Sequence, residues 1–287
     1  MKKSPHLYAI TTIVLWSLAF PLTKLVLREV TPFSLGFLRY AAASVALLAL
    51  CFITRMPLPK WRDIPWFFAG GFAGFFLYMV TFNTGASSVS SATSSVIISS
   101  APVMTAGLAV LFFKEKLQAR QWIAMALELS GVLILTLYGA VFTTNTGTLW
   151  LILAALSVSC YNLIQRRLTR TYSALQITAY SIFAGTLCLA IFAPAAVREV
   201  PSVSVMPLVY LAILGVFPSA IGYIAWATAF AKAERTSQVT NYMFFTPLLA
   251  GLFGALFGEG APDISTWVGG GVILLGAAIF YTKRKEF

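Results

Sequence analysis

The chain has little charge and few of the residues that enzymes commonly use. Only 10% of its 287 residues are charged and 59% are hydrophobic, whereas a soluble domain carries about 25% charged residues. It contains one histidine, His6, and three cysteines that fall within or at the ends of apolar segments. The odd cysteine count argues against a disulfide framework, and one histidine cannot build a histidine-based metal or nucleophile site. We expect no catalytic residue, no metal and no cofactor.

Long apolar segments fill most of the chain. A bilayer core about 30 Å thick takes roughly 20 apolar residues to cross as a helix. The alternation typical of membrane β-strands is absent, and lipid tolerates only helices or closed barrels. The sequence therefore predicts an all-α integral membrane protein with ten transmembrane helices, at residues 7–27, 33–54, 64–84, 93–113, 119–138, 147–165, 174–193, 205–228, 238–257 and 266–282.

The basic residues are divided unequally between the two sides of these segments. Loops on the side of the N-terminus hold sixteen of the 20 Lys and Arg residues, and the other side holds Lys24, Arg28 and Arg198. The positive-inside rule therefore predicts that both termini are cytoplasmic. Membrane orientation also accounts for the net charge of +11, so the expected partner is the lipid bilayer and not nucleic acid. We expect a multi-pass protein of a bacterial cytoplasmic (inner) membrane.

Unusual residues recur at a fixed distance along the chain. An offset of 145 relates four pairs: Tyr78 and Tyr223, Pro102 and Pro247, Trp122 and Trp267, Gly131 and Gly276. Earlier segments follow smaller offsets, such as 142 between Ser17 and Ser159. Because each half has five crossings, an odd number, the second half enters the membrane from the opposite side. We predict two inverted five-helix repeats, residues 1–145 and 146–287, in one membrane domain, an arrangement typical of transporters.

Four prolines lie inside the predicted helices. Pro102 and Pro247 each remove a backbone donor, which predicts a kink near the middle of the membrane with a free carbonyl acceptor. Pro21 and Pro218 do the same in the first and eighth segments. Proline is also common in membrane helices, where it shapes packing only, but its repetition across the duplication favours a role in gating.

Polar and aromatic side chains gather near these prolines. The serines of the fourth segment share one helix face with Pro102, although small hydroxyl residues also allow close helix packing. Aromatic residues with polar tips lie at middle depths, although Trp and Tyr also favour membrane interfaces. Such a lining suits an amphipathic organic solute. The predicted substrate-binding residues are Trp16, Ser17, Tyr78, Ser95, Ser99, Tyr161, Tyr223, Trp226, Asn241 and Tyr242.

Two charged residues fall inside predicted segments. Arg39 lies in the second and Glu128 in the fifth, and their depths differ by only about 5 Å for a helical rise of roughly 1.5 Å per residue. Ionisable groups inside a membrane are functional candidates and normally find partners. We expect the two side chains to form a structural ion pair, and proton coupling through Glu128 is the alternative.

Three segments in this order resemble a known family. They are "LWSLAFPLTK" from Leu15 to Lys24, "FLRYAAA" from Phe37 to Ala43 and "SAPVMTAGLAVLFFKEKL" from Ser100 to Leu117. With the ten crossings in two halves, they resemble the EamA-type branch of the drug/metabolite transporter superfamily. This resemblance implies cytoplasmic termini, a central cavity between the halves, and export of amino acids or related metabolites. By motif position it implies that the cavity lies near Trp16, Ser17, Pro21, Ser99, Pro102, Asn241 and Pro247.

The second half departs from this pattern at two places. The turn "FGEGA" at residues 257–261 lacks the lysines that flank Glu115, and Leu163 stands where the first half has Pro21. The two ends of the predicted cavity are therefore not expected to be equivalent gates.

The sequence thus predicts a secondary transporter, and not an enzyme. We expect it to export a small amphipathic metabolite, such as a neutral or aromatic amino acid, by alternating access, as a monomer or a dimer. One alternative is an integral-membrane enzyme that acts on a lipid substrate, but such enzymes use clusters of acids or histidines. Another alternative is a pore, but no ring of carbonyls or charges resembles a filter.

Overall fold

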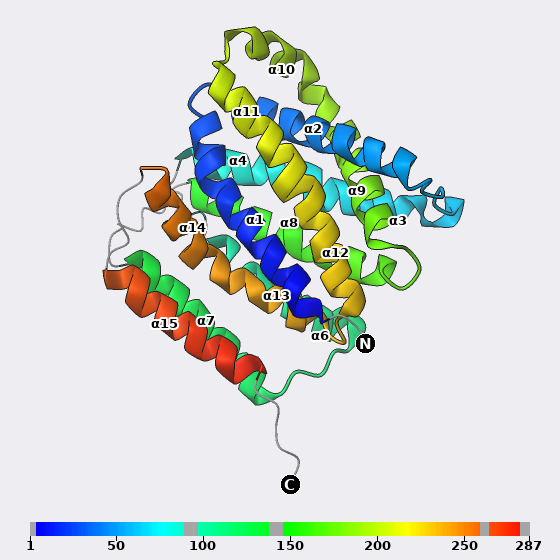
Figure 1. Ribbon diagram of the computed structural model, residues 1–287. Helices are drawn as coiled ribbons and strands as arrows, with labels where there is room; N and C mark the ends of the chain where they lie inside the picture. The colour runs from blue at the N-terminus through cyan, green and yellow to red at the C-terminus, as the bar shows by residue number, and fades with distance from the viewer. Residues whose placement is uncertain (1–3, 89–93, 95–96, 138–145, 259–263, 282–287) are drawn as a thin grey trace.

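The computed structural model of the chain is a helical bundle (Figure 1), and it describes residues 4–88, 94, 97–137, 146–258 and 264–281. Residues of the first half form α1 (Pro5–Val26), α2 (Pro32–Ile53), α3 (Ile64–Gly71), α4 (Tyr78–Ser88), α6 (Ala101–Phe113) and α7 (Ala119–Leu137). Those of the second half form α8 (Thr146–Leu168), α9 (Ala174–Leu189), α10 (Ala193–Glu199), α11 (Val205–Leu214), α12 (Gly222–Lys232), α13 (Thr236–Thr240), α14 (Thr246–Leu256) and α15 (Ile264–Tyr281).

Most of these helices have the length and composition of membrane crossings. Among the described residues, seven helical stretches are long and apolar enough to span a bilayer, and two shorter apolar helices, Ala101–Phe113 and Trp267–Tyr281, accompany them. Helix α7 coincides with the fifth predicted crossing. The predicted class, an all-helical membrane protein, is confirmed, and the number of ten crossings stays a prediction.

Local capping explains where several helices begin. Pro5 and Pro32 occupy the first turns of α1 and α2, where a missing N–H costs no helical hydrogen bond. Each follows a hydroxyl residue whose side chain accepts a backbone N–H of the first turn. Helix α9 starts with a capping box between Ser173 and Gln176.

Two crossings contain a π-helical segment. Phe72–Leu77 joins α3 to α4, and Gly215–Ile221 joins α11 to α12. The two segments occupy equivalent positions of the predicted repeat, because they precede Tyr78 and Tyr223 of the matched pair. A π segment disturbs the regular i to i−4 bonding and frequently occurs at functional sites.

Side chains of α1 and α8 donate to the carbonyls of these π segments. The indole Nε1 of Trp16 donates to the carbonyl oxygen of Pro218 over 3.1 Å, and the hydroxyl of Ser157 donates to that of Ala73 over 2.6 Å. Ala73 and Pro218 are separated by the same 145 residues as the matched pairs. Each π segment is therefore supported by the first helix of the other half.

Pro102 and Pro247 stand at the start of new helices. Pro102 lies in the first turn of α6, and Pro247 lies in the first turn of α14, after a 3-10 segment at Asn241–Phe245. By contrast, α1 continues through Pro21, and Pro218 lies inside the second π segment. A new helix therefore begins at each of the two prolines of the repeated pair.

One hydrogen bond recurs beside these two prolines. The hydroxyl of Ser17 donates to the carbonyl oxygen of Thr246 over 3.3 Å, and that of Ser159 donates to the carbonyl oxygen of Ala101 over 3.1 Å. Each acceptor is the residue before the proline, and each donor belongs to the first helix of the opposite half. Consistent with these bonds, α1 packs against α12 and α14, and α8 packs against α4 and α6.

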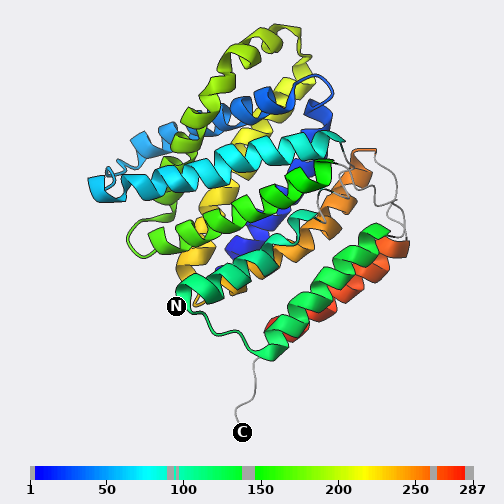
Figure 2. The same ribbon diagram turned by 180° about the vertical axis from the view of Figure 1, so that it is seen from behind.

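Helices α7 and α15 form an antiparallel pair along one side of the bundle (Figures 1 and 2). Their contact depends on small residues, as is common between membrane helices. A Cβ atom added to Gly131 would lie 2.8 Å from the carbonyl oxygen of Gly269 and 2.9 Å from the amide nitrogen of Ile273. At Gly276, its counterpart in the predicted repeat, an added Cβ atom would meet the side-chain Cγ of Glu128 and, at 3.0 Å, the carbonyl oxygen of Ala124.

We predict that Gly131→Ala lowers the stability of this pair by about 1 to 3 kcal/mol, because backbone atoms of α15 must move to admit the methyl group. The matched control is Gly271→Ala, since nothing lies within 4 Å of a Cβ atom there. The melting temperature of the purified protein in detergent measures the difference. Equal melting temperatures for the two variants would contradict this packing.

Candidate functional site

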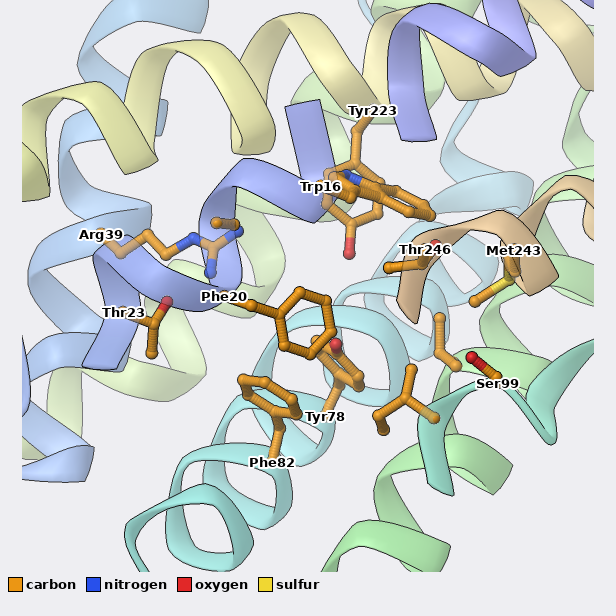
Figure 3. Close-up of a pocket in the computed structure, with 13 residues that line it drawn as sticks. Trp16, Phe20, Thr23, Arg39, Tyr78, Phe82, Ser99, Tyr223, Met243 and Thr246 are labelled. Carbon is orange, nitrogen blue, oxygen red and sulfur yellow. The ribbon is translucent and has the colours of Figure 1, made fainter. Parts of the chain in front are cut away.

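A cavity lies in the middle of the bundle, where the two halves meet. Its empty volume, including the open space at its mouth, is about 580 Å³. Six helices, the residues before α6 and the 3-10 segment η6 (Asn241–Phe245) contribute to its wall (Figure 3). The lining residues are Trp16, Ala19, Phe20, Thr23, Arg39, Tyr78, Phe82, Ile98, Ser99, Val158, Tyr223, Met243 and Thr246.

The lining is mostly aromatic and apolar, with a few polar groups. Arg39 is the one charged side chain among the lining residues that the structure describes. Thr23 lies beside it, and Ser99, Met243 and Thr246 lie on the opposite side in Figure 3. A solute with one polar end and an apolar body therefore matches this wall.

Aromatic contacts hold the wall in place. The ring centroid of Trp16 is 4.9 Å from that of Tyr223 and 4.9 Å from that of Trp226. The indole nitrogen of Trp226 donates to the side-chain oxygen of Asn162 over 3.0 Å. On the other side, Phe20 and Phe82 meet edge to face at 5.7 Å. These rings are thus positioned by other groups before any solute enters.

The structure brings together only some of the residues predicted to bind substrate. Trp16, Tyr78, Ser99 and Tyr223 line the cavity. Ser17, Tyr161 and Trp226 are fully buried outside the lining set: Ser17 bonds to α14, Tyr161 packs on Tyr223, and Trp226 packs on Trp16. Ser95 lies outside the described residues.

Asn241 and Tyr242 are not among the lining residues, although Met243 of the same 3-10 segment is, and they contact α7 and α15 instead. Asn241 donates to Glu128 of α7, and Tyr242 contacts the ring of Tyr281 in α15 and that of His6. The repeat offset pairs Asn241 with a residue of the fourth crossing, but it does not predict which way a side chain points in a short 3-10 segment. A 3-10 segment has fewer residues per turn than an α-helix, so the side chain of Asn241 points towards α7 and not into the cavity.

Phe20, Thr23, Phe82 and Thr246 line the cavity and were not predicted to do so. A helical-face argument finds the first three: Phe20 and Thr23 follow Trp16 by four and seven residues, and Phe82 follows Tyr78 by four. Thr246 has no such signal, because the helix breaks just before it. A second, smaller pocket shares Phe20, Thr23 and Phe82 with the cavity and extends to Lys24.

The expected ion pair between Arg39 and Glu128 is wrong. The Nε of Arg39 donates to the hydroxyl of Ser219 over 2.7 Å. Glu128 accepts from the side-chain amide of Asn241 over 2.8 Å and is fully buried. Similar depth in the membrane did not bring the two together, because depth specifies neither the face of a helix nor its lateral position.

Comparison with known proteins matches the entire bundle to one family. The family model described as "EamA-like transporter family" matches this chain twice, at residues 3–137 and 145–282. A solved crystal structure that covers 100% of this chain, and is itself covered over 100% of its length, superposes with a TM-score of 0.82 at 19% identity. That likeness concerns the fold alone.

Relatives of this chain are named as transporters. "Uncharacterized transporter YdfC" of Bacillus subtilis is 32% identical, over 95% of this chain and 89% of that protein. "Probable terminal-alkyne amino-acid exporter" of Streptantibioticus cattleyicolor is 30% identical, over 97% and 94%. "Uncharacterized inner membrane transporter YhbE" of Escherichia coli is 28% identical, over 90% and 82%.

We predict that Asn241→Ala destabilises the protein by about 1 to 3 kcal/mol, because the buried carboxyl of Glu128 loses its hydrogen-bond donor. Replacing both partners, as in Glu128→Leu with Asn241→Leu, removes the polar groups together and restores most of the stability. Melting temperatures in detergent measure both effects. A single variant that melts like the native protein, or a double variant that melts no higher than Asn241→Ala, would argue against this pair.

Proposed function

Because this chain belongs to the EamA-like transporter family, we propose that it exports a small amphipathic metabolite, such as a neutral or aromatic amino acid, by alternating access through the central cavity. It is a multi-pass membrane protein. In this proposal, residues 1–145 and 146–287 are two inverted five-helix repeats with ten crossings. Both termini are cytoplasmic, in a bacterial cytoplasmic membrane.

The observation that carries the proposal is the repeated bond next to the cavity. Ser17 binds the carbonyl before Pro247, and Ser159 binds the carbonyl before Pro102. Two equivalent hinges that face the same cavity are what an inverted repeat needs to exchange one access state for the other. The double match of the family model supports the same division.

The two ends of the cavity differ in the contacts between their helices, which supports the proposal that one end is closed and the other is open. The guanidinium of Arg166 in α8 donates to the carbonyl oxygens of Phe230, Ala233 and Glu234, at 2.6, 2.9 and 2.7 Å, and so ties α8 to the connection between α12 and α13. Glu115 accepts the backbone N–H of Thr236 at the start of α13 over 2.9 Å. At the other end, Lys24 holds the position equivalent to Arg166 and lines the smaller pocket.

Export as the direction, and an amino acid as the solute, are supported by the printed name of one relative. The enzyme alternative is not favoured, since the relatives described above are named as transporters. Conversion of a labelled lipid by the purified protein would restore it.

Glu128 is proposed as a structural partner of Asn241, so Glu128→Gln, which keeps an acceptor for the amide, is expected to transport normally. Loss of transport in that variant would support proton coupling.

The proposal predicts that cells overexpressing this protein release a specific solute that cells with an empty vector retain. Tyr78→Ala should reduce the release by about tenfold, which corresponds to about 1.4 kcal/mol of lost interaction. The variant lacks the aromatic ring that forms part of the cavity wall. Tyr210→Ala, the same change outside the cavity lining, is the matched control. Metabolite analysis of the medium measures the release by the native protein and by both variants, at equal levels of each protein in the membrane. An unchanged medium, or equal release by both variants, would refute the proposal.

A further inference from the structure

Arg39 is a buried cation that no carboxylate of the described residues neutralises, and its guanidinium carbon lies 5.7 Å from the ring centroid of Tyr40. Its side chain is 5% exposed and belongs to the cavity wall. Figure 3 shows the guanidinium directed into the cavity beside Thr23 and Phe20. Charged side chains inside a membrane protein normally pair with one another or with backbone carbonyls, or they mark a substrate pathway.

A hydrogen bond from Nε fixes the position of this guanidinium. Its Nε donates to Ser219 in the second π segment over 2.7 Å. The backbone is held as well, because a Cβ atom at Gly215 would lie 2.9 Å from the carbonyl oxygen of Arg39. The two terminal nitrogens have no hydrogen-bond partner among the described residues, and no carboxylate of those residues forms an ion pair with them.

We infer that Arg39 binds the carboxylate of the transported solute, which makes the substrate class a monocarboxylate with an apolar body; this rests on the proposed function. A guanidinium presents parallel N–H donors that fit a carboxylate better than any neutral polar group. With Nε engaged by Ser219, the two terminal nitrogens remain as that fork. The hydroxyl of Thr23 adjoins the same end of the cavity.

The rest of the lining limits what accompanies the carboxylate. Phe20, Tyr78 and Phe82 offer aromatic surface for an apolar body. The described lining has one cation only, so a second anionic group on the solute would be buried without a partner, which is costly. The described lining has no acid to pair with an ammonium, which its aromatic faces can contact instead. The amine of an amino acid is therefore tolerated, whereas its carboxylate is required.

The first test uses four probes that share a phenyl ring. L-phenylalanine and 3-phenylpropionate carry a carboxylate, whereas L-phenylalaninamide and phenethylamine do not. We expect the two carboxylates to raise the melting temperature of the purified native protein at concentrations at least tenfold below those at which the other two act. Equal action of the two groups of probes, or no stabilisation by either carboxylate, overturns the inference.

Variants assign the preference to Arg39. Arg39→Gln should abolish the difference between carboxylate and amide, and Arg39→Lys, which keeps the charge without the fork, should retain part of it. Arg198→Gln, an exposed arginine outside the cavity, is the matched control. If Arg39→Gln does not fold, Arg39→Lys and the native protein carry the comparison. A preserved carboxylate preference in the Gln variant, or an undiminished one in the Lys variant, overturns the assignment.

The solute found in the medium separates this inference from the proposed function. A released solute with one carboxylate and an apolar body supports both. A released solute without a carboxylate upholds transport and overturns the role of Arg39. Release of no solute overturns the proposed function, and the assignment to Arg39 falls with it.

Discussion

Backbone polar groups inside a bilayer must be satisfied within the protein, because the hydrocarbon offers no partner. At four places in the centre of this chain, where helices change type or begin, side chains of one half donate to backbone carbonyls of the other. Trp16 and Ser17 of α1 bind carbonyls of the second half, and Ser157 and Ser159 of α8 bind carbonyls of the first half. The breaks in the helices, and the cavity that they surround, depend on these bonds.

The same bonds interleave the two halves. Helices α1 and α8 each pack against the half to which they do not belong in sequence. The predicted repeats are therefore units of sequence. In the proposed alternating access, each moving body is expected to contain the first helix of the other half. A displacement of α1 alters the surroundings of Thr246 and Pro218 together, and a displacement of α8 does the same for Ala73 and Ala101. In the proposed alternating access, this coupling links the two ends of the cavity.

Hydropathy and the offset of 145 were enough to predict the helical class and the two breaks at Pro102 and Pro247. They were not enough for the π segment at Phe72–Leu77, which contains no proline and has no distinctive spacing. The cavity was predicted through Trp16, Tyr78, Ser99 and Tyr223, but Asn241 faces α7 instead. Sequence periodicity gives the face of a regular helix, and it fails where the helix changes type. For Arg39 and Glu128, depth alone could not decide lateral distance.

The central claim is that one cavity is reached from both sides of the membrane in turn. The most direct measurement uses Val158→Cys, a cavity position on α8, in a chain whose three native cysteines are replaced by alanine. A small, membrane-impermeant methanethiosulfonate reagent is applied to right-side-out and to inside-out vesicles, with the cysteine-free chain as the blank. The account predicts that Cys at this position is labelled from either face and is protected by the transported solute. Labelling from one face only, in the presence and absence of solute, would contradict it.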